Sequence, residues 1–207
     1  AEQSITHPGN ATAAGGATVT EDYTSKAYFM TTDNSGTFDA FTNSGTTATV
    51  ETGPASGNGG SGDYIYFEAT PAFTGETSYV SETFDFSAYN NPQISYYYHM
   101  YGSTMGSLAV QVNTGAGWIS LWSVSGQQQG GTASSWIQNA IDLSAYAGEA
   151  SCQIRFLATR GAGIESDIAL DDIVVSDLVG AITGNFEFVN LTVNNTGGNA
   201  VLSSAVE

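Results

Sequence analysis

Short runs in which apolar residues recur at every second position follow one another along the chain, and they constrain its fold more than any other feature. Leu108, Val110 and Val112 in SLAVQVN show the pattern. Neighbouring side chains of a strand point to opposite faces, so this spacing gives a strand one apolar face to bury. Further candidate strands lie at 27–30, 64–69, 94–101, 118–124, 137–143, 152–158 and 168–175. Glycine, asparagine and serine separate these runs, which predicts an all-β, antiparallel β-sandwich with short turns.

The 207 residues suit one domain with short additions at its ends. Residues 1–17 are small, polar and glycine-rich, and we interpret them as a leader or linker. The sandwich is predicted over residues 18–176, with at most a short helical turn at 144–148. Residues 177–207 alternate again in NFEFVNLTVNN, so they form either an extra hairpin or the start of a following domain.

The charge of the chain is one-sided. Lys26, Arg155 and Arg160 are the only basic residues against 20 acidic ones, which gives a net charge of −17. Such a surface repels nucleic acid and anionic lipid, so both are excluded as partners. The sequence has no run of about 18 apolar residues, so we expect no membrane insertion. Most carboxylates are interpreted as a solubilising surface, and a few as candidates to hold a cation.

Residues suited to catalysis are sparse. A nucleophile needs a neighbouring base, and the two histidines are His7, in the predicted leader, and His99, expected as a packed, hydrogen-bonded ring. Cys152 is the single cysteine and shares a strand face with Ile154, so we expect a buried, unreactive thiol. A pair of carboxylates could hydrolyse glycosides, and the number of acidic residues does not exclude one. We predict that the chain is not an enzyme.

Gly57, Gly59 and Gly62 match G-x-G-x-x-G, a pattern of dinucleotide-binding loops. That fingerprint follows a strand and opens a helix, whereas here it leads into the predicted strand YIYFEA. We therefore expect a flexible surface loop rather than a nucleotide site.

The sharpest feature is the acidic residues of SDIALDDIVV, which are Asp167, Asp171 and Asp172. Strict alternation would place Asp171 on a face with Ala169 and Ile173, and Asp172 on the other face with Leu170 and Val174. Both faces are otherwise apolar, so at least one carboxylate is expected to be partly buried. A buried carboxylate needs an arginine, several N–H donors or a cation, with calcium first among the cations. The sequence leaves these three possibilities open.

Several motifs in order resemble one family. ETFDFSAYNNPQISYYYHMYGSTMGSLAVQV is followed by WISLWSVSG, IDLSAY and IRFLATRGAGIESDIALDDIVV, while TFDAFTNSG and TGPASGNGGSGDYIYFEA lie upstream. Together these segments resemble the MAM domain over roughly residues 18–176. The resemblance implies a jelly-roll β-sandwich that acts outside the cell in adhesion or recognition and is not itself catalytic. The single cysteine departs from the paired cysteines of animal members and is more similar to bacterial relatives.

The resemblance also implies a structural calcium ion, or sodium, held between an early acidic residue, the early loop and an aspartate of the closing strand. Carried over to this sequence, the ligands would be Glu21 in the first strand, Asp39 and Asn58 in the early loop, and Asp171 or Asp172 in the closing strand. Asn58 stands where the family often has an aspartate, which weakens the cation at that position.

These observations predict a non-catalytic, extracellular adhesion or protein-interaction module of a larger secreted or cell-surface protein, with a structural calcium and a protein or glycan partner. The alternative is a carbohydrate-binding module of a secreted polysaccharide-degrading enzyme. Tyr97 and Tyr101 share a face with His99, and Tyr64 shares another with Tyr66. A planar row of exposed aromatic rings would favour glycan binding, although such tyrosines in a sandwich more often pack in the core or half-buried.

Overall fold

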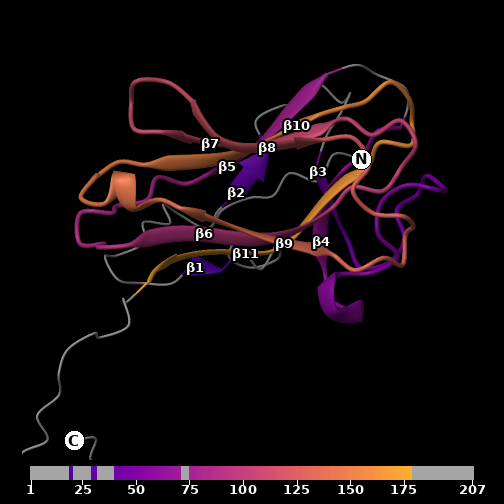
Figure 1. Cartoon of the computed structure of the whole chain (residues 1–207), viewed down its shortest axis with the longest axis horizontal. Coiled ribbons are helices and arrows are strands. Elements are labelled where there is room, and N and C mark those ends of the chain that lie inside the picture. The colour runs from indigo at the N-terminus through magenta and orange to yellow at the C-terminus, as the bar shows by residue number, and fades with distance from the viewer. Residues whose placement is uncertain (1–18, 21–28, 32–39, 71–74, 179–207) are drawn as a thin grey trace, which may run out of the picture.

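The computed structural model describes residues 19–20, 29–31, 40–70 and 75–178, which form two antiparallel sheets packed face to face (Figure 1). The six-stranded sheet has the order β3-β4-β11-β6-β9, with β1 also pairing with β11. Its strands are β1 (Val19–Thr20), β3 (Ala40–Asn43), β4 (Tyr64–Phe67), β6 (Pro92–His99), β9 (Ile137–Asp142) and β11 (Ile168–Asp177).

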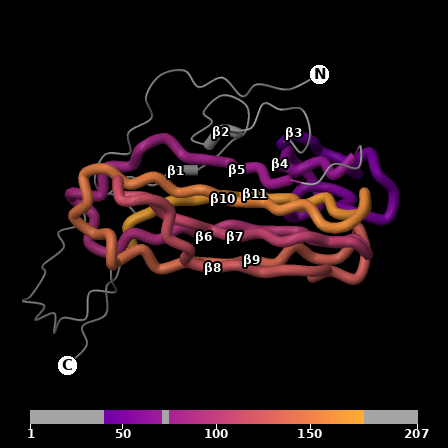
Figure 2. The backbone as a smooth tube through the Cα atoms, turned by 90° about the horizontal axis from the view of Figure 1, so that it is seen from above, coloured from indigo at the N-terminus to yellow at the C-terminus, as the bar shows by residue number. Residues whose placement is uncertain are grey.

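The five-stranded sheet forms the second layer, with the order β2-β5-β10-β7-β8. Its strands are β2 (Phe29–Thr31), β5 (Glu76–Ser81), β7 (Ser107–Asn113), β8 (Ile119–Ser125) and β10 (Gln153–Thr159). Figure 2 shows the strands of both layers running along the same long axis. The predicted jelly-roll β-sandwich is thereby confirmed.

Helical structure in the described ranges is limited to two 3-10 turns, η1 (Asn58–Gly60) and η2 (Ser144–Tyr146). The second turn falls where the sequence predicts a short helical turn. Neither is nearly long enough to cross a lipid bilayer as a helix.

The core lies between the two sheets and is built from the residues that recur at every second position. Leu108, Val110 and Val112 are fully buried, and so are the alternating residues of β10. Tyr96 from one sheet meets Phe156 from the other edge-on, with ring centroids 4.9 Å apart. Cys152 belongs to the same core, and burial raises the pKa of its thiol to about 12, which agrees with an unreactive cysteine.

The strand β5 is missing from the sequence prediction because its polar residues hide the pattern. Ser78 and Ser81 are buried beside apolar neighbours, and the peptide N–H of Ile154 donates to Ser81 Oγ at 2.8 Å. Thr77 is buried as well, but its Oγ1 has no hydrogen-bond partner among the described residues. A hydroxyl that finds a partner inside a sheet can be buried at little cost, and composition alone does not reveal this. The short strand β3 is missing from the prediction as well.

The closing strand β11 continues to Asp177, one residue beyond the predicted sandwich. The Asp177 carboxylate accepts hydrogen bonds from the peptide N–H groups of Asn90 and Asn91. Residues 1–17 and most of 177–207, predicted as leader and extension, lie outside the described residues.

Candidate binding site at the closing strand

The closing strand β11 contains a bulge at the two neighbouring aspartates. Its register with β6 shifts between Asp171 and Val174, and Asp172 has a φ of +47°, in the left-handed region. The extra residue breaks the alternation, so Ile173 lies on the buried inner face and Asp171 does not share a face with it. The faces that strict alternation predicts for Ile173 and Asp172 are therefore wrong, whereas the predicted burial of one carboxylate is confirmed.

Asp171 is that carboxylate, with a side chain only 5% exposed. Its Oδ2 accepts a hydrogen bond from the peptide N–H of Asn58 at 2.7 Å, and its Oδ1 accepts one from the N–H of Asp172 at 2.7 Å. Burial raises the pKa of this carboxyl to about 6, while the two donors act in the opposite direction. Of the three possible partners, N–H donors are present, and no ion pair to an arginine is found among the described residues.

Asn58 makes a second contact with the closing strand, because its Nδ2 donates to Asp172 Oδ2 at 2.8 Å. The asparagine therefore supplies two donors to two carboxylates, where an aspartate would add a third negative charge.

A glycine is required at position 57, beside Asn58. A Cβ at Gly57 would lie 2.6 Å from the Ser61 carbonyl oxygen and 3.2 Å from Asp171 Oδ2. The loop expected to be flexible is packed onto β11, and we call Gly57, Asn58, Asp171 and Asp172 the closing-strand site.

The predicted cation ligands are thus only partly brought together. Asn58, Asp171 and Asp172 meet in the closing-strand site, while Glu21 and Asp39 lie outside the described residues. Within the described ranges, no group of three or more histidine, cysteine, aspartate or glutamate side chains is arranged to hold a metal. Backbone oxygens do gather there. The place that a Cβ of residue 57 would occupy lies 2.6 Å from the Ser61 carbonyl oxygen and 2.8 Å from that of Gly62. Asp171 Oδ2 is 3.2 Å from the same place, so three oxygens converge there. Carbonyl and carboxylate oxygens are the donors that calcium prefers.

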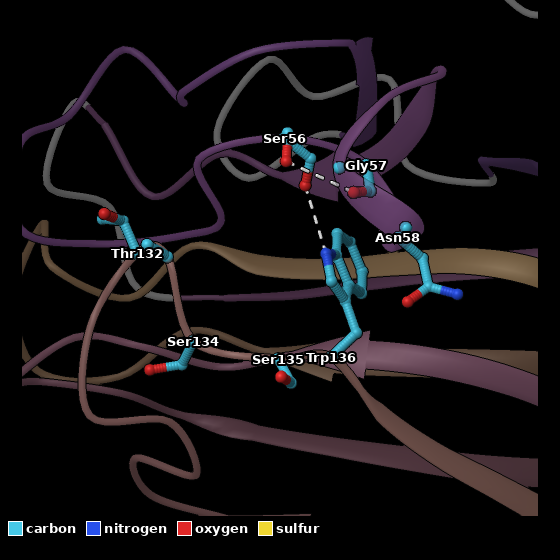
Figure 3. A pocket seen from close by; sticks show the side chains of 10 residues that line it. Ser56, Gly57, Asn58, Thr132, Ser134, Ser135 and Trp136 are labelled. Atoms are coloured by element: carbon cyan, nitrogen blue, oxygen red, sulfur yellow. Dashed lines mark hydrogen bonds between the residues drawn. The ribbon is translucent and has the colours of Figure 1, made fainter.

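A polar cleft of about 430 Å³ opens beside the closing-strand site, between residues 56–60 and residues 132–136 (Figure 3). Trp136 stands between the two segments and donates its Nε1–H to the Ser56 carbonyl at 3.1 Å. Its ring packs edge-on against Tyr64 and against His99. This cleft was not predicted from the sequence. The available signal was a tryptophan that ends a run of small polar residues, GGTASSW.

The tyrosines proposed for glycan stacking do not form an exposed row. Tyr64 and Tyr66 are buried with Ala169 in a small cluster on the outer face of the six-stranded sheet, and Tyr97 and Tyr101 are half-buried. This confirms the expectation of packed or half-buried rings.

His99 is buried against the same cluster. The predicted packed ring is confirmed, and the backbone of Ser134 and Gly131 lies close to its nitrogens, although neither nitrogen forms a well-aligned hydrogen bond within the described part of the chain. Burial lowers the pKa of His99 to about 4, although the nearby backbone of Ser134 and Gly131 acts in the opposite direction. The imidazole is therefore neutral at pH 7.

A second buried carboxylate, Asp167, lies at the start of the closing strand and is fully buried. Its Oδ1 accepts from the Ala69 N–H at 2.9 Å, and its Oδ2 has no hydrogen-bond partner among the described residues. Arg160 is buried nearby, but its Nε donates to the Ala69 carbonyl at 2.9 Å. Asp167 thus binds the N–H of Ala69, and Arg160 binds the carbonyl of the same residue. Burial raises the pKa of Asp167 to about 7.

The fold and the site together define a jelly-roll β-sandwich whose early loop is bonded to its closing strand through a buried aspartate. Residues 20–178 match the family model of the MAM domain, meprin/A5/mu. The chain belongs to this family.

Curated relatives and solved structures agree with this assignment. The chain is 34% identical over 135 residues to thyroid hormone-induced protein B of Xenopus laevis, with 63% of this chain and 18% of that protein covered. It is 34% identical over 134 residues to MAM domain-containing glycosylphosphatidylinositol anchor protein 1 of Gallus gallus, with 61% and 13% covered. The chain thus spans under a fifth of the length of these relatives.

The fold is shared with the K1 cleaved adhesin domain of Lys-gingipain from Porphyromonas gingivalis W83. The two superpose with a TM-score of 0.57 at 15% sequence identity, covering 78% of this chain and 98% of that domain. At this identity the likeness concerns the fold alone.

Proposed function

We propose that this chain is a non-catalytic interaction module of a larger secreted or cell-surface protein, which binds an extracellular protein through the cleft beside Trp136. The observation that carries the proposal is the construction of this cleft. One wall, residues 56–60, is fixed to β11 by Asn58 and Asp171, and Trp136 joins that wall to the other through its bond to Ser56. A rigid, polar cleft containing a half-buried aromatic ring is a typical protein recognition surface.

Family membership and chemistry support the proposal. MAM domain-containing relatives include a protein whose name states a glycosylphosphatidylinositol anchor, which supports a position at the cell surface or outside the cell. His99 supports a non-catalytic role, because a buried imidazole that stays neutral down to about pH 4 is poorly suited to exchange protons with a substrate.

The binding function is tested by presenting the full chain to two matched arrays, one of extracellular protein domains and one of glycans, in calcium and in EDTA. Trp136→Ala is the test variant, and Gln138→Ala, an exposed residue of the neighbouring strand β9, is the control. Protein binding that is lost in Trp136→Ala and kept in Gln138→Ala is expected. Protein binding that survives in Trp136→Ala, or no protein binding at all, would contradict the proposal.

Carbohydrate binding is the second candidate function, and one observation favours it. Trp136 shares its cleft with the hydroxyl groups of Ser134, Ser135 and Thr132, and an indole beside hydroxyls is a common way to hold a sugar ring (Figure 3). In the same arrays, glycan binding that depends on Trp136, without protein binding, would replace the first function by this one.

The proposed module holds a structural calcium ion at the closing-strand site, with sodium as the weaker alternative. Asp171 and the carbonyl oxygens of Ser61 and Gly62 would hold the ion, which would fix the early loop to the closing strand. The buried carboxylate and the converging carbonyl oxygens support this assignment.

Calorimetric titration of the EDTA-treated full chain with calcium chloride tests the ion, with melting temperature as a second measurement. Saturable binding and a rise in melting temperature are expected for the wild type, because a ligand that binds only the folded state stabilises it. Asp171→Asn should weaken binding by at least about tenfold, since it removes a charged ligand. Identical melting curves in calcium and EDTA would reject the proposal, and an equal effect of sodium would favour sodium.

A further inference from the structure

The outer face of the five-stranded sheet carries a cation, Arg155, which forms no direct ion pair among the described residues, although the charge of Glu76 reaches it. Arg155 lies on β10 and is partly exposed, whereas Arg160 is buried. No ion pair involves Arg155 among the described residues, although the chain carries a net charge of −17. An accessible guanidinium that remains unpaired on so acidic a protein is available to an anion from outside.

Arg155 is held in one position by three neighbours on the same face. Its Nε donates to Gln111 Oε1 at 2.7 Å, and its Nη1 donates to Ser78 Oγ at 3.3 Å. Its guanidinium carbon lies 4.3 Å from the centroid of the Trp118 ring. These contacts use two of the five N–H donors of the guanidinium, so three remain for a ligand. A fork that is already oriented loses little side-chain entropy when it binds a carboxylate.

The hairpin between β7 and β8 places Trp118 over this face. Asn113 Oδ1 accepts hydrogen bonds from the N–H groups of Gly115 and Gly117, at 2.8 and 3.1 Å. Both glycines have φ near +110°, which other residues rarely adopt. The turn is therefore specified by the sequence NTGAGW, and the ring adjoins the guanidinium as a consequence of the local backbone.

The surroundings of Arg155 are flat and polar. β10 pairs with β7 at Arg155 and Gln111, and β7 pairs with β8 at Gln111 and Ser120, so these side chains form one row across the sheet. Gln153 and Asn113 form the next row, and all five are at least partly exposed. Amides and a hydroxyl offer donors and acceptors to sugar hydroxyls, whereas a peptide ligand would need apolar pockets for anchors.

We infer that this surface, defined by Arg155, Gln111, Trp118 and Ser120, binds a sugar that carries a carboxylate, such as a uronic acid residue of an acidic glycan. The carboxylate accepts two parallel hydrogen bonds from the free N–H groups of Arg155. The sugar ring lies on the polar row beside the indole. This surface is on the sheet opposite the Trp136 cleft. A test that rejects binding at one of the two surfaces therefore does not affect the proposal for the other.

The test is calorimetric titration of the full chain with a trisaccharide of galacturonic acid, in EDTA so that calcium bound to the sugar plays no part. A short probe limits the long-range repulsion between the acidic protein and an acidic polymer. The methyl-esterified trisaccharide, which has the same rings without charge, is the control ligand. We expect binding of the acid and at least about tenfold weaker binding of the ester, because charge-assisted pairs contribute most of such affinity.

Three variants make the test specific. Arg155→Gln should weaken binding by about tenfold or more, and Arg155→Lys should lie between it and the wild type, because lysine keeps the charge but loses the bidentate fork. Gln138→Ala, on the other sheet, should bind as the wild type does. Melting curves confirm that each variant is folded, and the lysine variant keeps the test decisive if the glutamine variant is unstable.

The inference is overturned if the wild type does not bind the acidic trisaccharide, if the ester binds equally well, or if Arg155→Lys binds no more weakly than the wild type. A glutamate tetrapeptide with blocked ends is titrated in parallel. Binding of the peptide as tight as that of the sugar would show an anion site without sugar recognition and would also overturn the inference.

Discussion

Asp167 and Asp171 lie four positions apart at the closing strand. Both side chains are buried, but their carboxylate oxygens accept different numbers of hydrogen bonds. Asp171 accepts one N–H on each oxygen. Asp167 accepts the Ala69 N–H on Oδ1, and its Oδ2 has no well-formed hydrogen bond among the described residues, although the side chains of Thr47 and Glu68 act on it. Burial raises the pKa of Asp171 to about 6 and that of Asp167 to about 7. The difference shows how the bulge helps to bury a carboxylate: it turns the backbone N–H of Asp172 toward Asp171, which gives that carboxylate a second donor.

The largest effect is expected from Asp171→Ala. The change leaves the N–H groups of Asn58 and Asp172 without their acceptor, and each such loss costs about 1–3 kcal/mol. We therefore expect the free energy of unfolding to fall by about 3 kcal/mol, measured by urea denaturation at pH 4, where the carboxyl is mostly neutral in the folded state and about half neutral in the unfolded state, so that its raised pKa adds little. A loss below about 1 kcal/mol would mean that water replaces the carboxylate and that the loop does not depend on it.

Asp167→Asn is expected to act in the opposite direction. The folded-state pKa of Asp167 is raised, so its charged form opposes folding, and the penalty grows as the pH rises from about 4 to 7. The rise in pKa from 3.8 to about 7 corresponds to about 4 kcal/mol at about 1.4 kcal/mol per unit. Because the buried asparagine amide brings a desolvation cost of its own, the variant should be more stable by roughly 1–3 kcal/mol at pH 8.

The pH dependence separates this effect from general repacking. The difference in unfolding free energy between Asp167→Asn and the wild type should be small at pH 4, rise toward pH 7 and then stay level. His99 cancels from this difference, although its lowered pKa makes both proteins lose stability below about pH 6.5. A difference that is constant from pH 4 to pH 8 would show that Asp167 does not titrate as proposed.

The smallest effect is expected from Asp172→Asn, which serves as the control for Asp171. Asp172 is exposed, and asparagine tolerates its left-handed backbone well. We expect the unfolding free energy to change by less than about 0.5 kcal/mol. If Asp172→Asn destabilised the protein as much as Asp171→Ala does, the bulge rather than the buried carboxylate would be the critical feature.

Much of the fold follows from the sequence because one apolar face per strand leaves few alternatives. Leu108, Val110 and Val112 require a partner layer, and the same pattern in β10 supplies it. The burial of an aspartate in an otherwise apolar strand is predictable for the same reason. Strict alternation has no means of including an extra residue, so the bulge after Asp171 and the exposed position of Asp172 were not predictable.

The partners of the site were harder to predict than its acidic residues. The contact between Asn58 and Asp171 joins positions 113 residues apart, and no local pattern specifies such a pair. The Trp136 cleft also depends on two distant segments that meet only in the folded protein. The family resemblance identified Asn58 and the closing-strand aspartates together, which physical pattern alone did not do.

The pairing of β1 with β11 has a mechanical consequence for a host protein. Val19 pairs with Val175 in antiparallel orientation, so the start of β1 and the end of β11 lie side by side at one end of the sandwich. Tension applied between the start of β1 and the end of β11 would therefore load this two-residue ladder first, one hydrogen-bonded pair at a time.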